Sequence, residues 1–102
     1  MAKGSVSYEL SARADQDLSD ILRYGLQEFG ERRAVAYFNA LLETIEQIGA
    51  MPQAYMLRDV GGLQIRVAPH SVHVILYEIQ ESGTAFILTI RGARENWQGY
   101  SL

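Results

Sequence analysis

Leu63 to Trp97 holds three short apolar runs, LQIRVAP, VHVILYEI and AFILTIRGARENW, which decide the fold. The runs are rich in Val, Ile, Leu and aromatic residues, and the segments Pro-His-Ser and Glu-Ser-Gly-Thr interrupt them. Apolar runs of this length, bounded by turn residues, predict three strands of an antiparallel meander. Because the interruptions are short, hairpin turns can connect the strands. We expect the residues before Leu63 to pack onto this sheet.

Side chains alternate between the two faces of a strand. In the last run, this alternation is expected to separate Phe86, Leu88 and Ile90 from Ile87, Thr89 and Arg91. The middle run is largely apolar on both faces, which is typical of a central strand. If the three registers align, Arg66 and Arg91 lie on one face. His73 or Tyr77 would join them there, although the sequence does not fix the register.

Length and composition predict a single domain over residues 1–102 with a modest hydrophobic core. No apolar run approaches the roughly 20 residues that a membrane helix needs. The first ten residues, MAKGSVSYEL, lack the apolar segment of a signal peptide. The absence of cysteine excludes structural disulfides and Cys-ligated zinc. We therefore expect a cytoplasmic protein that does not associate with membranes.

The charge balance gives no general reason to expect nucleic-acid binding, because the net charge is −3. Eight of the nine basic residues are Arg, which makes planar, bidentate contacts and tolerates partial burial better than Lys. Although the net charge is negative, some of these Arg residues could still form a local basic binding site. Direct sequence-specific binding of nucleic acid is not expected.

The N-terminal residues predict a strand followed by a helix. Ser5 to Leu10 alternates apolar and polar side chains, as a half-buried strand does. Ser11 can cap a helix, and Asp15 and Asp17 in its first turns complement the helix dipole. Apolar residues then recur at helical spacing, at Ala14, Leu18, Ile21, Leu22, Leu26 and Phe29. Gly25 within this stripe either weakens the helix or permits close packing.

A second helix is predicted from Glu31 to Gly49, and the short join at Gly30 implies an antiparallel pair of helices. Its apolar seam has spacings of four and three, at Ala34, Phe38, Leu41, Ile45 and Ile48. Gln53 to Gly62 is expected to be a connector. The predicted class is therefore α+β. It has an N-terminal strand and an antiparallel helical hairpin, packed on a mainly antiparallel sheet with a three-stranded C-terminal meander.

Three segments resemble a known family. YELSARADQDLSDILRY (8–24) is similar to the opening of the ParE branch of the RelE/ParE superfamily of type II toxins. FGERRAVAYFNALLETIEQIGAMPQAY (29–55) resembles its helical hairpin, and HVILYEI and ILTIRGAR resemble its last two strands. One departure is Arg91, where the last strand of the family commonly ends in His. The effect of this departure on target contact stays open.

The resemblance implies a small toxin with no cofactor, neutralised by a cognate ParD-like antitoxin. It also implies that the toxin binds DNA gyrase, stabilises the cleaved complex of gyrase with DNA, and so blocks replication and arrests growth. Such proteins act by binding and perform no chemistry themselves, so no catalytic residues are assigned. The residues that contact the antitoxin stay open.

The alternative is the RelE branch, whose members are ribosome-dependent mRNA endonucleases. RNA cleavage needs a base, an acid and cations at the phosphate, for which the candidates are Arg66, Arg91, Arg94 and Tyr100. Val74 stands where we would expect a RelE-like protein to carry Arg, and the predicted sheet contains no Lys. A third hypothesis is a toxin fold that has lost its toxicity and serves only as a binding partner.

The predicted target-binding residues are Arg66, Arg91, Arg94 and Trp97. Arg and Trp are common anchors of protein interfaces. Near the C-terminus, two interpretations stay open. Either Trp97 folds back onto the core at the end of the strand, or it belongs to an exposed target-binding surface together with Arg91 and Arg94.

Other polar residues were weighed as reactive groups. His73 is either an acid or base or, more commonly for a His among Val, Ile and Leu, a hydrogen-bonded strand residue. His70 is expected to be exposed in a turn, and the two histidines form no recognised metal site. Ser11 and Ser71 have no His and Asp arrangement that would activate a nucleophile.

Overall fold

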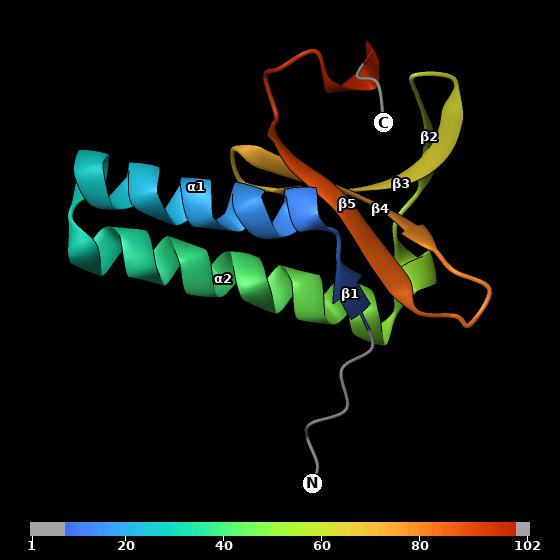
Figure 1. Cartoon of the computed structure of the whole chain (residues 1–102), viewed down its shortest axis with the longest axis horizontal. Coiled ribbons are helices and arrows are strands. Elements are labelled where there is room, and N and C mark those ends of the chain that lie inside the picture. Colours follow the sequence, from blue (N-terminus) through green and yellow to red (C-terminus); the bar gives the residue numbers. More distant parts are fainter. Residues whose placement is uncertain (1–7, 100–102) are drawn as a thin grey trace, which may run out of the picture.

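A computed structural model describes residues 8–99 of the chain (Figure 1). Its elements are β1 (Tyr8–Leu10), α1 (Ala12–Phe29), α2 (Glu31–Ala50), the 3₁₀ turn η2 (Pro52–Ala54), β2 (Leu57–Val60), β3 (Leu63–His70), β4 (His73–Ile79), β5 (Ala85–Gly92) and the 3₁₀ turn η3 (Trp97–Gly99). The α+β class is confirmed. The predicted N-terminal strand is present as β1, and residues 5–7 of that prediction lie outside the described part.

One five-stranded mixed sheet has the order β1-β5-β4-β3-β2. β1 is parallel to β5, and the other neighbouring strands are antiparallel. The meander has four strands where three were predicted, because Gln53–Gly62 contains β2 and is not a plain connector. β2 lies at the edge of the sheet and buries only Val60, so its sequence carries no alternation that would reveal a strand. Gly61 and Gly62, with φ of 58° and 88°, form the tight turn into β3.

The helices form an antiparallel hairpin that covers one face of the sheet (Figure 1). They approach closely at Gly25, where an added Cβ would lie only 3.1 Å from the Cβ of Ala34. Close packing is therefore the role of Gly25. Gly30, with φ of 86°, separates the two helices. The predicted apolar stripe of α1 is buried only in its first half, because Leu26 and Phe29 are 42% and 51% exposed.

Each face of the sheet carries its own hydrophobic cluster. The cluster on the helix side is formed by buried residues of the helices and of β3, β4 and β5: Ala14, Leu18, Leu41, Ile45, Ile48, Ala68, Ile75, Tyr77, Ala85, Ile87 and Ile90. The cluster on the opposite face consists of Val60, Ile65, Val67, Val74 and Leu76. β4 contributes to both clusters, as predicted for a central strand.

A β-bulge in β5 changes which of its side chains face the helices. Consecutive residues of β4 pair with Ile87 and Thr89, so Leu88 between them has no partner on β4. Ile87 and Ile90 consequently lie in the same cluster on the helix side. Strict alternation had placed these two residues on opposite faces, and that prediction is wrong because the extra residue shifts the phase of the strand.

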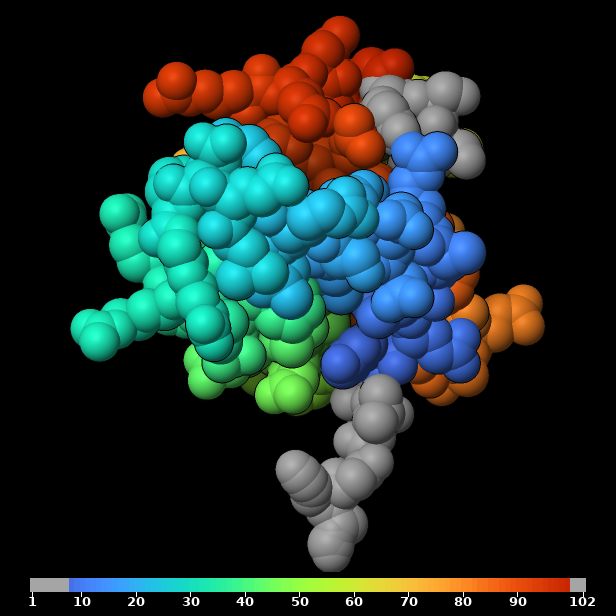
Figure 2. All heavy atoms as spheres, turned by 60° about the vertical axis from the view of Figure 1, so that its left-hand side comes forward, coloured from blue at the N-terminus to red at the C-terminus, as the bar shows by residue number. Residues whose placement is uncertain are grey.

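The residues after β5 return over the face of the sheet that the helices leave open. Trp97 of η3 packs against the cluster on that face, and the Gly61 amide donates to the Gln98 carbonyl across 2.8 Å. In Figure 2, the C-terminal residues (red) lie directly above α1 (blue to cyan). Within residues 8–99, neither helix is long and apolar enough to cross a membrane.

Candidate functional site

Arg91, the first of the predicted target-binding residues near the C-terminus, is held by an ion pair. Its Nε and Nη2 lie 3.0 and 2.9 Å from Oε1 of Glu95. The loop between them is closed by a 3.0 Å hydrogen bond from the Glu95 amide to the Gly92 carbonyl. The Ala93 amide also donates to the Val72 carbonyl across 2.7 Å. These bonds fix the end of β5 against the turn between β3 and β4.

Arg94 is exposed beside this turn. It lines a shallow surface hollow together with Ser71, Val72 and Glu95. Ser71 adopts a positive φ of 54°, and the Val72 side chain that follows is 65% exposed. The end of β5 therefore presents a cation next to an exposed apolar side chain, a combination suited to binding a protein surface.

Trp97 is half-buried, and it packs with Leu88 against the open face of the sheet. The Arg58 guanidinium lies 6.0 Å from the centre of its ring. The interpretation in which Trp97 folds back onto the core is confirmed. A contact of Trp97 with a target stays a prediction.

Arg66 lies apart from the C-terminal residues. It pairs with Tyr77 across the sheet, and its Nη1 donates to the Tyr55 carbonyl across 2.6 Å. Arg91 pairs with Val74, whose side chain belongs to the opposite face of the sheet. The predicted meeting of Arg66 and Arg91 on one face is wrong, because the registers place them on different faces and three β4 residues apart.

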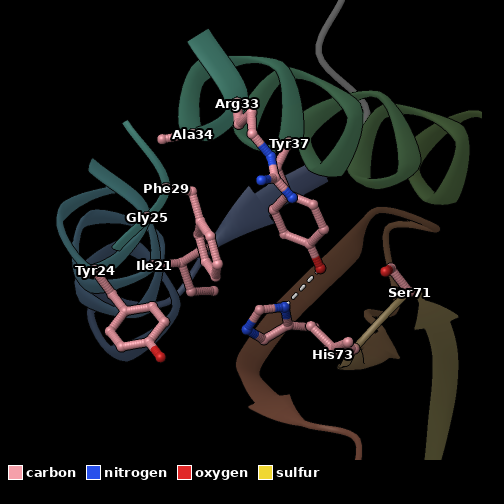
Figure 3. Close-up of a pocket in the computed structure, with 10 residues that line it drawn as sticks. Ile21, Tyr24, Gly25, Phe29, Arg33, Ala34, Tyr37, Ser71 and His73 are labelled. Carbon is pink, nitrogen blue, oxygen red and sulfur yellow. Dashed lines mark hydrogen bonds between the residues drawn. The ribbon is translucent and has the colours of Figure 1, made fainter. Parts of the chain in front are cut away.

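A groove of about 470 Å³, which the sequence did not indicate, lies between the tip of the helical hairpin and the turn before β4. Figure 3 shows Tyr24 and Phe29 from α1 on one side and Tyr37 from α2 beside His73 on the other. The Arg33 guanidinium lies 5.3 Å from the centre of the Phe29 ring. The groove is thus mainly aromatic, with a cation at its rim.

Hydrogen bonds at the base of the groove join α2 to the turn between β3 and β4. The Tyr37 hydroxyl lies 2.7 Å from Nδ1 of His73, and the Thr44 hydroxyl lies 2.8 Å from Nδ1 of His70. His70 was expected to be exposed in a turn. That prediction is wrong, because His70 is the last residue of β3 and is half-buried against α2.

Burial shifts the protonation of this cluster. It lowers the pKa of the His73 imidazole, the neighbouring His70 lowers it further, and Glu95 opposes the shift. Burial also raises the pKa of the Tyr37 phenol, although hydrogen bonds to Ser71 and Val72 counteract this. Both side chains are therefore held in their neutral forms at neutral pH. This explains His73 as a hydrogen-bonded strand residue, the commoner of the two alternatives.

Metal-ligating side chains do not form a cluster within residues 8–99. No group of three or more His, Asp or Glu side chains in this range could hold a metal ion. The Ser11 hydroxyl accepts from the Ala14 amide at 2.9 Å and so caps α1, as predicted. Tyr100, a candidate for RNA cleavage, lies outside the described residues.

Comparison with solved structures identifies the class of fold. A chain of the "Chromosomal ParDE TA system from P. aeruginosa" superposes with a TM-score of 0.76, over 87% of this chain and 97% of that one. The two sequences are 14% identical, so this likeness shows the fold alone. The class is thus the α+β fold of a helical hairpin on a five-stranded mixed sheet, as in that ParDE system.

The sequence identifies the family. The sequence model described as "ParE toxin of type II toxin-antitoxin system, parDE" matches residues 8–97. The chain therefore belongs to the ParE toxin family of type II toxin–antitoxin systems. A search of curated proteins gave no match.

Proposed function

We propose that the protein inhibits DNA gyrase by binding it, and that a ParD-like antitoxin neutralises it in the cytoplasm. The observation that carries this proposal is the match to the ParE toxin family over residues 8–97. The likeness to a chain of a ParDE system from P. aeruginosa supports the antitoxin partner. Gyrase is the target that the family resemblance implies for a ParE-like protein.

The positions of the cations favour binding over RNA cleavage. A phosphate transition state needs cations that converge on one point. Arg66 instead donates to the Tyr55 carbonyl on the helix side of the sheet, whereas Arg91 pairs with Glu95 beyond the end of β5. These two cations cannot hold one phosphate group in this arrangement. The arrangement of these two cations is therefore less favourable to RelE-like cleavage of mRNA on the ribosome, which remains the alternative function.

A supercoiling assay tests the proposed target. The purified protein is mixed with gyrase, ATP and relaxed plasmid, and supercoiled and cleaved DNA are measured. We expect supercoiling to be lost and cleaved DNA to accumulate. No effect at a large molar excess of folded protein would overturn the gyrase proposal. Cleavage of mRNA on ribosomes would then support the RelE-like alternative, and inactivity in both assays would support a fold without toxicity.

Arg94 is the residue of choice for testing the target-binding surface, because it is exposed and is not part of the hydrophobic core. Arg94→Ala is expected to weaken gyrase inhibition about tenfold, as loss of an interface anchor does. Arg23→Ala is the matched control, since Arg23 is exposed on α1 and pairs with the neighbouring Asp20 at 3.1 Å. Equal inhibition by both variants would exclude Arg94 from the surface.

The double variant Arg94→Ala with Trp97→Ala is expected to abolish toxicity while antitoxin binding remains. Because Trp97 also covers the open face of the sheet, this variant must be shown to be folded before it is interpreted. Co-purification with a tagged antitoxin provides that check and tests the second partner. A folded double variant that keeps full toxicity would show that the C-terminal residues do not contact the target.

A further inference from the structure

α1 takes over the role of a neighbouring strand along part of β5. β1 pairs with β5 only as far as Ile87. Beyond that point, the Ser11 hydroxyl donates to the Leu88 carbonyl across 2.8 Å. Oδ2 of Asp17 accepts from the Ile90 amide at 3.0 Å. The side chains of Ser11, which caps α1, and of Asp17 in α1 thus supply hydrogen-bond partners for backbone groups of β5 at the bulge.

Asp17 makes a second contact in the same place. The Thr89 hydroxyl donates to the same Oδ2 of Asp17 across 2.7 Å, and Thr89 is fully buried. Hydrogen bonds to an ionised carboxylate are stronger than neutral ones. A buried hydroxyl or amide left without a partner is costly. Asp17 therefore holds two consecutive residues of β5, where the sequence indicated only an acidic residue near a helix start.

The bulge decides which face the end of β5 presents. With Leu88 as the extra residue, Ile90 lies on the helix side and the next residue, Arg91, lies opposite Val74 on the open face. Without the bulge, Arg91 would share the face of Ile87 and point to the helix side. The segment of residues 91–97 would then lose its present position.

We propose that Asp17 is a positioning residue for the target-binding segment, residues 91–97, because it fixes the bulge of β5 at Thr89 and Ile90. The effect on the target rests on the proposed function. The effect on the position of the segment does not. Asp17 itself touches no target in this proposal, since its carboxylate is turned toward β5.

The test compares three variants of the full-length protein. Asp17→Ala removes the acceptor, whereas Asp17→Asn keeps one neutral side-chain oxygen, which can accept both bonds but more weakly than a carboxylate does. Asp20→Ala is the matched control on the exposed side of α1, where the carboxylate accepts hydrogen bonds from Gln16 and Arg23 of the same helix. Each variant is measured by amide hydrogen exchange and backbone chemical shifts in residues 88–97, and by gyrase inhibition.

In Asp17→Ala, we expect faster exchange of the Ile90 amide, shifted resonances through residue 97 and at least about tenfold weaker inhibition. Asp17→Asn should lie between this variant and the wild type, and Asp20→Ala should match the wild type. Unchanged resonances in residues 88–97 of Asp17→Ala would overturn the positioning role. A moved segment with unchanged inhibition would overturn its link to the target.

Two further results keep the inferences separate. If wild-type protein does not inhibit gyrase, the proposed function fails, and the resonances still decide the positioning role. If Asp17→Ala does not fold, Thr89→Val removes only the hydroxyl bond to Asp17 and leaves the Ile90 bond. Resonance shifts confined to residues 88–97 of Thr89→Val would support the proposal, and shifts spread over the whole core would contradict it.

Discussion

At the scale of single residues, the helical hairpin depends on Gly25. The Cα of Gly25 faces Ala34 so closely that even one methyl group would lie 3.1 Å from the Ala34 Cβ. Two small residues at the crossing allow α1 and α2 to approach, and the hairpin can then present both seams to the sheet. The size of the side chain at this position is thus a constraint on the whole helix layer.

Gly25→Leu is expected to lower the free energy of unfolding by about 1–3 kcal/mol, the usual cost of overpacking a core. The physical reason is that the new side chain has no space between the helices, so they must separate. Urea unfolding followed by circular dichroism measures the change. Ala36→Leu on the exposed face of α2 is the control, and it should leave stability nearly unchanged. Equal stability of both variants would contradict close packing at Gly25.

His73 gives stability a pH dependence whose sign follows from its lowered pKa. The folded protein binds this proton less tightly than the unfolded chain, in which the pKa is about 6.5. The stabilisation is therefore fully present above about pH 6.5 and is lost as the pH falls through the folded-state pKa. The free energy of unfolding should decrease more steeply on acidification in wild type than in His73→Gln. Parallel curves for the two proteins would contradict this assignment.

At the scale of elements, η3 acts as the cover of the second hydrophobic face. The helices lie on one side of the sheet only, so Val67, Val74 and Leu76 would otherwise meet solvent from the other side. Trp97 supplies the largest apolar side chain over them. The short turn η3 therefore has a structural role.

Trp97→Ala is expected to lower the free energy of unfolding by roughly 1–2 kcal/mol, because a half-buried apolar side chain is lost. Chemical unfolding monitored by circular dichroism measures this change. Met56→Ala is the control, since the Met56 side chain is 72% exposed. A Trp97→Ala protein as stable as the wild type would mean that η3 does not protect the open face.

The sequence predicted the elements that have regular apolar spacing and missed those that lack it. Ser11 as a cap, Gly30 as a helix end and β4 as a central strand apolar on both faces were all confirmed, because each follows from the local sequence. β2 was missed because its exposed edge position leaves no apolar pattern. The bulge at Leu88 was missed because the partners that stabilise it, on and just before α1, are distant in sequence.

At the scale of the whole molecule, the candidate site could be predicted from the sequence only where its residues are close together along the chain. Arg91, Arg94 and Trp97 are close in sequence, but the structure places Arg94 beside the turn between β3 and β4 and Trp97 on the open face of the sheet near Arg58. Arg66 was grouped with them on an assumed register, and the real register separates them. The groove beside Tyr37 and His73 joins residues from both helices and a turn. The register of the strands and the shape of the groove depend on how distant segments pack together. The spacing of residues along the chain does not predict either of them.

The overall charge of −3 predicts that the protein alone binds DNA poorly. Fluorescence anisotropy with a labelled duplex should show no saturable binding at physiological salt. Association with DNA should appear only when gyrase is also present, if gyrase is the target. A dissociation constant below about 1 μM for duplex DNA alone would contradict this prediction, since non-specific binding is ordinarily weaker.

The pairing of the first strand with the last one has a consequence for synthesis in the cell. The hydroxyl bond from Ser11 to Leu88 joins residues 77 positions apart. Because β1 pairs with β5, the sheet can close only after β5 has been synthesised. A chain whose synthesis stops before β5 would lack the strand that pairs with β1 and the surface at the end of β5. The completed sheet, and with it the surface at the end of β5, therefore forms late in the synthesis of the described residues, after both of its distant partners are present.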